Sequence, residues 1–193
     1  MTLDELRVDF ERTSNRSMSM PIAGAIAWSV VAILSVMLEF HFALVATFIC
    51  TGMIFLVAIG IGKIRSEEVL SNKNPMAKLM GMCAFMVNLL WAVHIPLFLY
   101  APQFVPLSLG ISIGLHWIVY SWIIQHPLGI IHAVLRTILI VLAWFVFAEH
   151  RPTSISLVIV FVYLLTLYQM NNRRYSVQQK LASLEQSQAE PAA

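Results

Sequence analysis

Charged residues are scarce in this sequence: Asp, Glu, Lys and Arg together make up 11% of its 193 residues. Soluble domains carry about a quarter charged residues, because a surface that faces water has to be covered by polar groups. With 59% hydrophobic residues, this chain would expose large apolar patches if it folded in water. In lipid, apolar surface needs no such cover. The composition therefore indicates an integral membrane protein.

The few cysteines, the small net charge and the placement of the histidines exclude several classes of function. The two cysteines, Cys50 and Cys83, lie inside apolar runs and match no metal-binding or redox spacing. The net charge of +2 is too small and too dispersed for a nucleic-acid partner. His94, His116 and His132 fall at different depths along three predicted helices, so they do not converge on one metal ion. We expect no metal, no cofactor and no nucleic-acid partner, and no catalytic motif is visible that would favour an enzyme.

Six apolar runs are long enough to cross the ~30 Å hydrocarbon core of a bilayer as helices. They are Met20–Leu38, Phe42–Ile61, Met76–Tyr100, Leu107–Ile124, Leu128–Phe147 and Ser154–Met170. Pro96 lies inside the third run and predicts a kink toward its outer end, because proline removes a helical hydrogen bond. The predicted fold class is all-α, a polytopic bundle of about six transmembrane helices.

The basic residues predict the orientation of this bundle. Ten of the twelve Lys and Arg residues lie in the N-terminal segment, the loop between the second and third runs and the C-terminal tail, and the opposite loops hold only Arg151. By the positive-inside rule both termini are cytoplasmic. In the basic loop, Glu67-Glu68 is expected to be solvated. The predicted organisation is a cytoplasmic amphipathic segment (residues 1–19), a six-helix transmembrane domain (20–170) and a cytoplasmic tail (171–193).

The N-terminal segment has an amphipathic pattern. Leu3, Leu6 and Phe10 recur near helical spacing, and charged residues cover the other faces. Thr2 and Glu5 have the spacing of a capping box. These features predict a short helix on the inner membrane surface, with a frayed polar tail as the alternative. The C-terminal tail is predicted to extend the last helix and then to become disordered.

Arg136 is the outstanding polar residue inside a run. An arginine near the bilayer centre costs about 2.5–3.5 kcal/mol, and no Asp or Glu lies inside any of the six runs to pair with it. Gln125, Gly129 and His132 extend the same helical face toward the cytoplasm. This stripe predicts one wall of a polar cavity that opens inward. The alternatives are that Arg136 reaches the headgroups with its long stem, or that it forms a purely structural bond.

Further polar groups lie at membrane depth in the third and fourth runs. Ser112, His116 and Tyr120 share one face of the fourth run, and Asn88 lies near the middle of the third. A single buried His or Asn more often forms a hydrogen bond between helices than a functional site. That structural interpretation is favoured for His116 and Asn88, and more strongly for His94.

Several short stretches stand out together: Asn74–Gly81, Asn88–Trp91, Pro96, Gly114–His116 and Tyr120–Trp122. They resemble an uncharacterised bacterial family of small multi-span integral membrane proteins, a domain of unknown function. The resemblance covers most of the chain and implies the inner membrane of a bacterium, with little about activity. It directs attention to Asn88, His116, Tyr120 and Trp122.

Two functions from different classes fit these observations. The leading hypothesis is a small-solute transporter or channel-like protein that binds a small anionic or polar solute. Its predicted site is formed by Asn88, His116, Tyr120, His132 and Arg136. The alternative is a scaffold or accessory subunit that binds a partner or lipid and is packed tightly through its glycines: Gly81, Gly110, Gly114 and Gly129. Apart from the lipid bilayer, a homo-oligomeric partner is left open.

Overall fold

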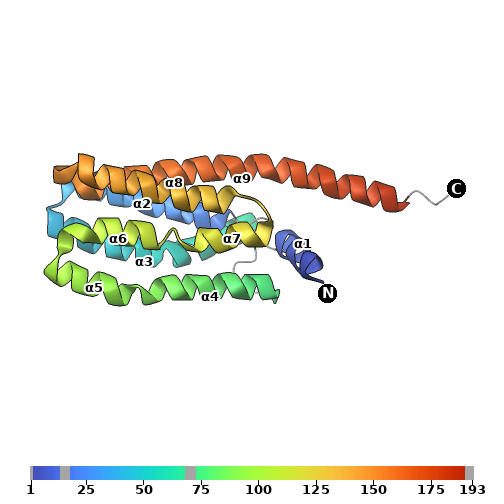
Figure 1. The fold of residues 1–193 in the computed structure, drawn as a ribbon, viewed down its shortest axis with the longest axis horizontal. Coiled ribbons are helices and arrows are strands. Elements are labelled where there is room, and N and C mark those ends of the chain that lie inside the picture. Colours follow the sequence, from blue (N-terminus) through green and yellow to red (C-terminus); the bar gives the residue numbers. More distant parts are fainter. Residues whose placement is uncertain (1, 14–17, 68–72, 190–193) are drawn as a thin grey trace.

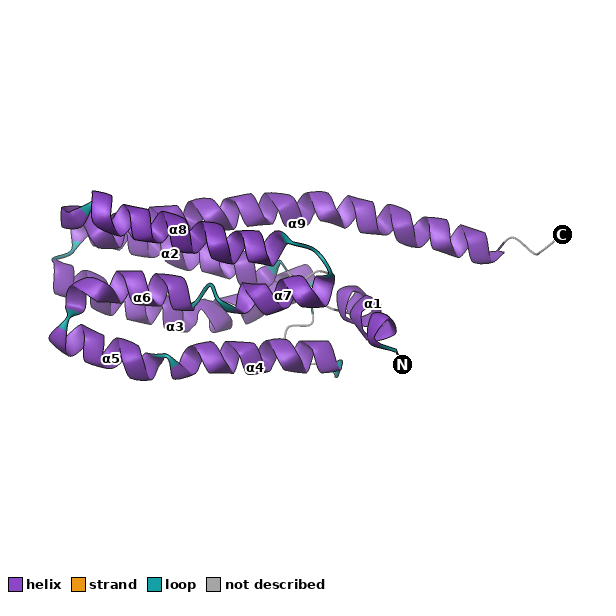
Figure 2. Cartoon of the chain, viewed as in Figure 1, coloured by secondary structure: helices purple, strands orange, loops and turns teal. Residues whose placement is uncertain are grey.

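The computed structural model describes residues 2–13, 18–67 and 73–189, and these residues form helices and turns with no strand (Figure 2). Six segments of this described part of the chain are long and apolar enough to cross a membrane, which confirms the predicted fold class. They are Ser19–Met37, Phe40–Arg65, Pro75–Tyr100, Pro102–Ile124, Leu128–Val146 and Ala148–Arg173. Each overlaps one of the predicted runs.

The helices lie side by side in one elongated bundle (Figure 1). Helix α2 (Ser19–Met37) packs against α3 (Phe40–Arg65) and against α9 (Arg151–Ala189), and α8 (Leu128–Val146) also packs on α9. The third span lies at the edge of the bundle as α4 (Pro75–Leu89) and α5 (Trp91–Tyr100). Most of its surface is left uncovered by other helices. Large apolar side chains therefore face outward, as expected where lipid is the solvent.

Two spans are interrupted. The third breaks at Leu90, upstream of Pro96 and nearer mid-span than the predicted kink. The fourth consists of the short 3₁₀ helix η1 (Pro102–Phe104), α6 (Val105–Ser112) and α7 (His116–Ile124), with a loop between α6 and α7 (Figure 2). Non-helical backbone at membrane depth is tolerated where protein or an internal cavity surrounds it. The second break therefore marks an interior region of the bundle.

Side chains satisfy helix ends at one end of the bundle. The Asn74 side chain accepts a hydrogen bond from the Met76 amide (2.8 Å) at the start of α4. Glu67, which follows α3, accepts hydrogen bonds from the Ser19 amide (3.0 Å) and hydroxyl at the start of α2, and from Arg65 (2.6 Å). Glu67 is buried, so the expectation of a solvated residue is wrong for it. Glu68 lies outside the described residues.

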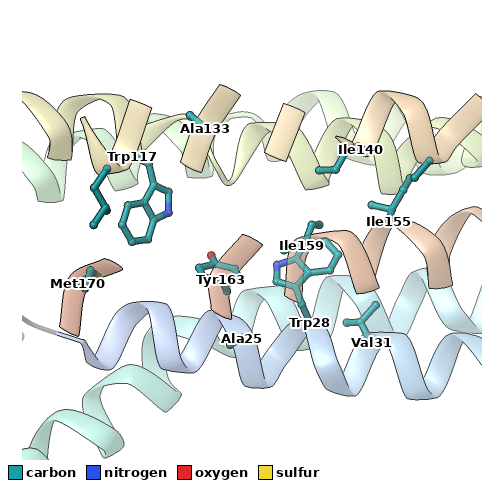
Figure 3. Packing of buried hydrophobic residues seen from close by; sticks show 12 residues of the cluster. Ala25, Trp28, Val31, Trp117, Ala133, Ile140, Ile155, Ile159, Tyr163 and Met170 are labelled. Carbon is teal, nitrogen blue, oxygen red and sulfur yellow. The ribbon is translucent and has the colours of Figure 1, made fainter. Parts of the chain in front are cut away.

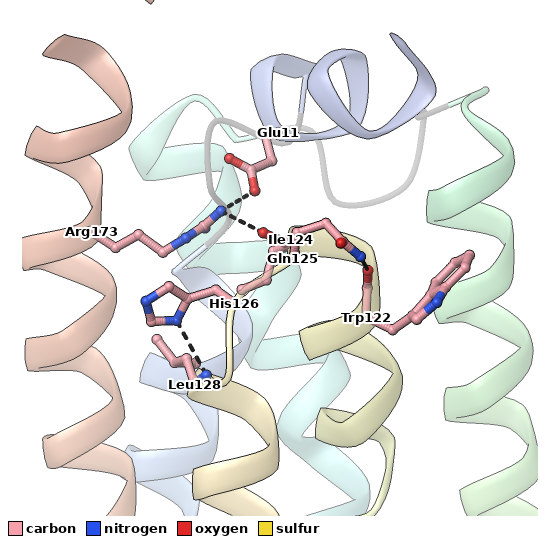
Figure 4. Close-up of polar contacts among 7 residues, drawn as sticks. All are labelled: Glu11, Trp122, Ile124, Gln125, His126, Leu128 and Arg173. Atoms are coloured by element: carbon pink, nitrogen blue, oxygen red, sulfur yellow. Dashed lines mark hydrogen bonds and ion pairs between the residues drawn. The ribbon is translucent and has the colours of Figure 1, made fainter. Parts of the chain in front are cut away.

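The N-terminal segment forms α1 (Leu3–Thr13), and its capping box is confirmed by reciprocal hydrogen bonds between Thr2 and Glu5. Phe10 is buried among Met76, Ile123 and Ile124, so α1 packs against the end of the bundle. Glu11 pairs there with Arg173 of α9, which also donates to the Ile124 carbonyl (Figure 4). Helix α1 and the C-terminal part of α9 lie at the same end of the bundle (Figure 1).

Candidate functional site

The break between α6 and α7 releases a backbone carbonyl into the bundle. In a regular helix, the Gly114 amide would donate to the Gly110 carbonyl. Here it donates to the Ile111 carbonyl instead (2.9 Å), as in a tighter 3₁₀ turn. The Gly110 carbonyl accepts a hydrogen bond from Nε of Arg136 on α8 (2.7 Å). The interrupted helix thus supplies a neutral acceptor for a buried cation.

Arg136 is held deep in the bundle, with 0% of its surface exposed. Its guanidinium carbon lies 5.7 Å from the Trp28 ring centre and 5.4 Å from that of Tyr163, within the range of cation–π attraction. A Cβ at Gly114 would lie 2.9 Å from the Arg136 Cδ, so a glycine is needed beside this side chain. The guanidinium therefore does not reach the membrane surface, contrary to the alternative in which it extends to the headgroups.

The two terminal nitrogens of Arg136, Nη1 and Nη2, are buried, and neither forms a hydrogen bond of standard geometry with a described residue. The Tyr163 side chain is a polar neighbour that interacts with the guanidinium. No carboxylate in the described part of the chain forms an ion pair with this arginine. Nε is occupied by the Gly110 carbonyl, so the open edge of the guanidinium is the one that carries Nη1 and Nη2. Two N–H groups on one edge match the two oxygens of a carboxylate or phosphate.

His132 lies one turn before Arg136 on α8 and is also buried, with 1% of its surface exposed. Its Nδ1 is 2.7 Å from the Thr166 hydroxyl on α9. Its ring stacks on Trp117 of α7 at 4.4 Å between centroids and contacts Tyr163 edge-on at 5.1 Å. The other ring nitrogen, Nε2, has no partner among the described residues.

Two indole nitrogens also lack a hydrogen-bond partner among the described residues. Nε1 of Trp28 and Nε1 of Trp117 are buried without a hydrogen-bond partner in the described part of the chain. Figure 3 shows the two indoles on either side of Tyr163, with their nitrogen edges turned toward that residue. We call the group formed by Trp28, Trp117, His132, Arg136 and Tyr163 the Tyr163 cluster. It joins α2, α7, α8 and α9.

The structure brings some, but not all, of the predicted site residues to this cluster. Arg136 and His132 belong to it. His116, the first residue of α7, has its ring 5.9 Å from that of Trp117, and the ring of Tyr120 contacts Trp117 at 5.4 Å. Asn88 is exposed on α4 and donates to the Ala84 carbonyl of its own helix (2.9 Å), so it lies apart from the cluster.

The predicted polar stripe is interrupted at its cytoplasmic end. Gln125 is exposed, ends α7 in a left-handed conformation (φ 50°), and donates to the Trp122 carbonyl, so it is not on α8. A Cβ at Gly129 would lie 2.0 Å from the Trp117 carbonyl oxygen, which shows that α7 and α8 touch through their backbones there. Contact between helices, rather than an inward-opening wall, therefore lies on that side of His132.

His94 has the structural role that the sequence favoured. It is buried, and its two ring nitrogens contact the hydroxyls of Ser112 (3.0 Å) and Ser108 (3.2 Å). These contacts join α5 to α6. Because both nitrogens have partners, His94 is a hydrogen-bonded link between two spans.

Sequence reasoning missed the aromatic members of the cluster. Trp28 and Tyr163 lie near the middle of their spans, whereas Trp and Tyr are usually enriched at the membrane interfaces. Each ring also carries one polar group that needs a partner when it is buried. An aromatic residue with a polar group at mid-span was therefore an available signal.

Comparison with known proteins identifies the family of the chain. No curated protein and no solved structure matches it. A family model described as "Family of unknown function (DUF7010)" matches residues 3–173, which include α1 and all six spans. The chain is a multi-pass membrane protein that belongs to this family of unknown function (DUF7010).

Proposed function

We propose that this protein is a membrane transporter that binds a small anion at the Tyr163 cluster. The observation that carries the proposal is the open edge of Arg136: Nη1 and Nη2 are fully buried and form no hydrogen bond of standard geometry in the described part of the chain, with the Tyr163 side chain as a polar neighbour. A bound anion would neutralise the guanidinium and accept hydrogen bonds from both nitrogens. The indole N–H groups of Trp28 and Trp117 would add two further donors.

The surrounding backbone also supports a transport role. Helices that are interrupted near the middle of the membrane form the solute sites of many transporters, because a broken helix exposes backbone groups to the solute. Here the break between α6 and α7 lies beside Arg136 and supplies the Gly110 carbonyl. The inner membrane of a bacterium and cytoplasmic termini are part of this proposal, based on the distribution of basic residues.

Anion binding can be tested by the thermal stability of the purified protein in detergent. We expect sodium acetate, phosphate or sulfate to raise Tm relative to sodium chloride at equal ionic strength, because a ligand that binds only the folded state stabilises it. Arg136→Gln should abolish the increase. Arg151→Gln is the matched control, since Arg151 also donates through Nε to a carbonyl (Trp144, 3.1 Å) and lies over an indole ring.

Transport is tested separately by uptake of radiolabelled acetate into proteoliposomes. Uptake that depends on Arg136 would support the proposal. Binding without uptake would contradict transport and favour the non-transporting scaffold. If no anion raises Tm, the open nitrogens hold nothing more than water or structural contacts, and anion binding is refuted.

A further inference from the structure

The hydrogen-bonding groups of the Tyr163 cluster are chemically unequal. Arg136 and the indoles of Trp28 and Trp117 present donors alone, because neither a guanidinium nor an indole nitrogen accepts a hydrogen bond. His132 is different, because an imidazole nitrogen without a proton is an acceptor. Whether Nε2 carries a proton depends on the hydrogen bond that Nδ1 makes.

The contacts of the Thr166 hydroxyl determine which nitrogen of His132 carries the proton. Its hydroxyl lies 2.8 Å from the Val162 carbonyl and 2.7 Å from Nδ1 of His132. The hydroxyl has one proton, and a carbonyl can only accept. The proton therefore goes to Val162, and Thr166 turns a lone pair toward Nδ1, which must carry the hydrogen. In the neutral imidazole, Nε2 is then a buried acceptor with no partner among the described residues.

We infer that the ligand of this site is a small 2-hydroxycarboxylate, whose carboxylate binds Nη1 and Nη2 of Arg136 and whose hydroxyl donates to Nε2 of His132. This inference rests on the proposed anion site and adds that the ligand carries a hydroxyl group next to its carboxylate. Arg136 and His132 are four residues apart on α8, and side chains at that spacing are neighbours on one face of a helix. Both also lie against the Tyr163 ring, at 5.4 Å for Arg136 and 5.1 Å for His132, so one small ligand can contact both. The aromatic rings would surround its alkyl part.

Charge favours a hydroxyl over an amino group on the ligand. A 2-amino acid carries an ammonium group that would lie beside the guanidinium of Arg136. No carboxylate of the described residues pairs with Arg136 to offset the second positive charge. A hydroxycarboxylate has a net charge of −1 and leaves the buried site neutral when it binds.

The inference is tested by comparing L-lactate with propanoate in the thermal stability assay. The two acids share three carbons and one carboxylate and differ only in the hydroxyl. We expect L-lactate to bind at least about tenfold more tightly, because propanoate leaves the buried Nε2 acceptor unpaired. His132→Asn should remove the preference for L-lactate over propanoate, because an amide nitrogen replaces Nδ1 and nothing replaces Nε2. Thr166→Ser keeps the hydroxyl and should keep the preference.

The outcomes separate this inference from the proposed function. Equal affinities for lactate and propanoate, both lost in Arg136→Gln, would overturn the hydroxyl assignment and leave the anion site standing. Stabilisation by phosphate or acetate but not by lactate would also overturn the hydroxyl assignment and leave the anion site standing. A response to no anion at all would overturn both. If His132→Asn does not fold, the comparison of the two acids on the wild-type protein still decides the question.

Discussion

The close approach of α7 and α8 at Gly129 provides a sharp test of the structure. Replacing Gly129 by alanine would place a methyl group 2.0 Å from the Trp117 carbonyl oxygen and 2.9 Å from the Ser121 hydroxyl oxygen. Carbon and oxygen atoms in contact are normally about 3.3 Å or more apart. The backbone of α7 would therefore have to move away from α8 by about 1 Å, because no rotamer change can relieve a clash with a carbonyl.

The energetic cost follows from this geometry. Overpacking of a close helix contact typically costs about 1–3 kcal/mol, and the upper part of that range applies when the obstacle is backbone. The higher helix propensity of alanine returns at most about 1 kcal/mol. We expect Gly129→Ala to destabilise the protein by about 2 kcal/mol. It should also weaken the anion response, because the movement separates Trp117 from His132, whose rings now stack at 4.4 Å.

The measurement is thermal unfolding in detergent, followed by near-ultraviolet circular dichroism of the aromatic side chains. Gly81→Ala is the matched control, because a Cβ there would meet no heavy atom within 4 Å. It should leave Tm unchanged or slightly higher. If Gly129→Ala is as stable as Gly81→Ala, the backbone contact between α7 and α8 is refuted.

Two further predictions concern the end of the bundle where α1 packs. Burial acts to raise the pKa of Glu67, but hydrogen bonds from Ser19 and the charge of Arg65 outweigh it, so the folded-state pKa lies below the ordinary glutamate value. The ionised Glu67 side chain therefore stabilises the protein above the unfolded-state pKa, and this stabilisation is lost as the pH falls through the folded-state pKa. Glu67→Gln should remove this loss of Tm at acid pH. A pH profile of Tm that is the same in Glu67→Gln and wild type would contradict the assignment. Glu11→Gln breaks the ion pair with Arg173 and should speed proteolysis of α1, with little change in the global Tm; equal proteolysis rates would show that the pair does not hold α1.

The sequence predicted the six spans because their signal is local. Each span is a run of apolar residues long enough for a bilayer, and the predicted limits differ from the observed ones by a few residues at most ends. The depth of Arg136 and His132 was predictable for the same reason, since depth depends on position within a run. Burial of both side chains agrees with the cost of exposing them to lipid, although the sequence also allowed Arg136 to reach the headgroups.

Contacts between spans were harder to predict. Asn88 lies at a suitable depth but faces away from the cluster, because the rotation of a helix about its axis depends on its neighbours. Glu67 and Ser19 are far apart in the sequence, so nothing local revealed their hydrogen bonds. Of the four glycines proposed for tight packing, Gly81 has open space beside it, whereas the other three make close contacts: Gly110, Gly114 and Gly129.

Those three glycines connect the fold to the proposed site. Gly129 allows α7 to approach α8, which stacks Trp117 on His132. Gly114 leaves room for the Arg136 side chain, and the turn that contains it releases the Gly110 carbonyl to bind Nε. These contacts fix the guanidinium through Nε and leave the edge that carries Nη1 and Nη2 open. A protein that needed Arg136 only for stability would gain by pairing Nη1 and Nη2 as well, because unpaired buried donors are costly. The open edge is therefore better explained by a ligand that completes it than by packing of the bundle alone.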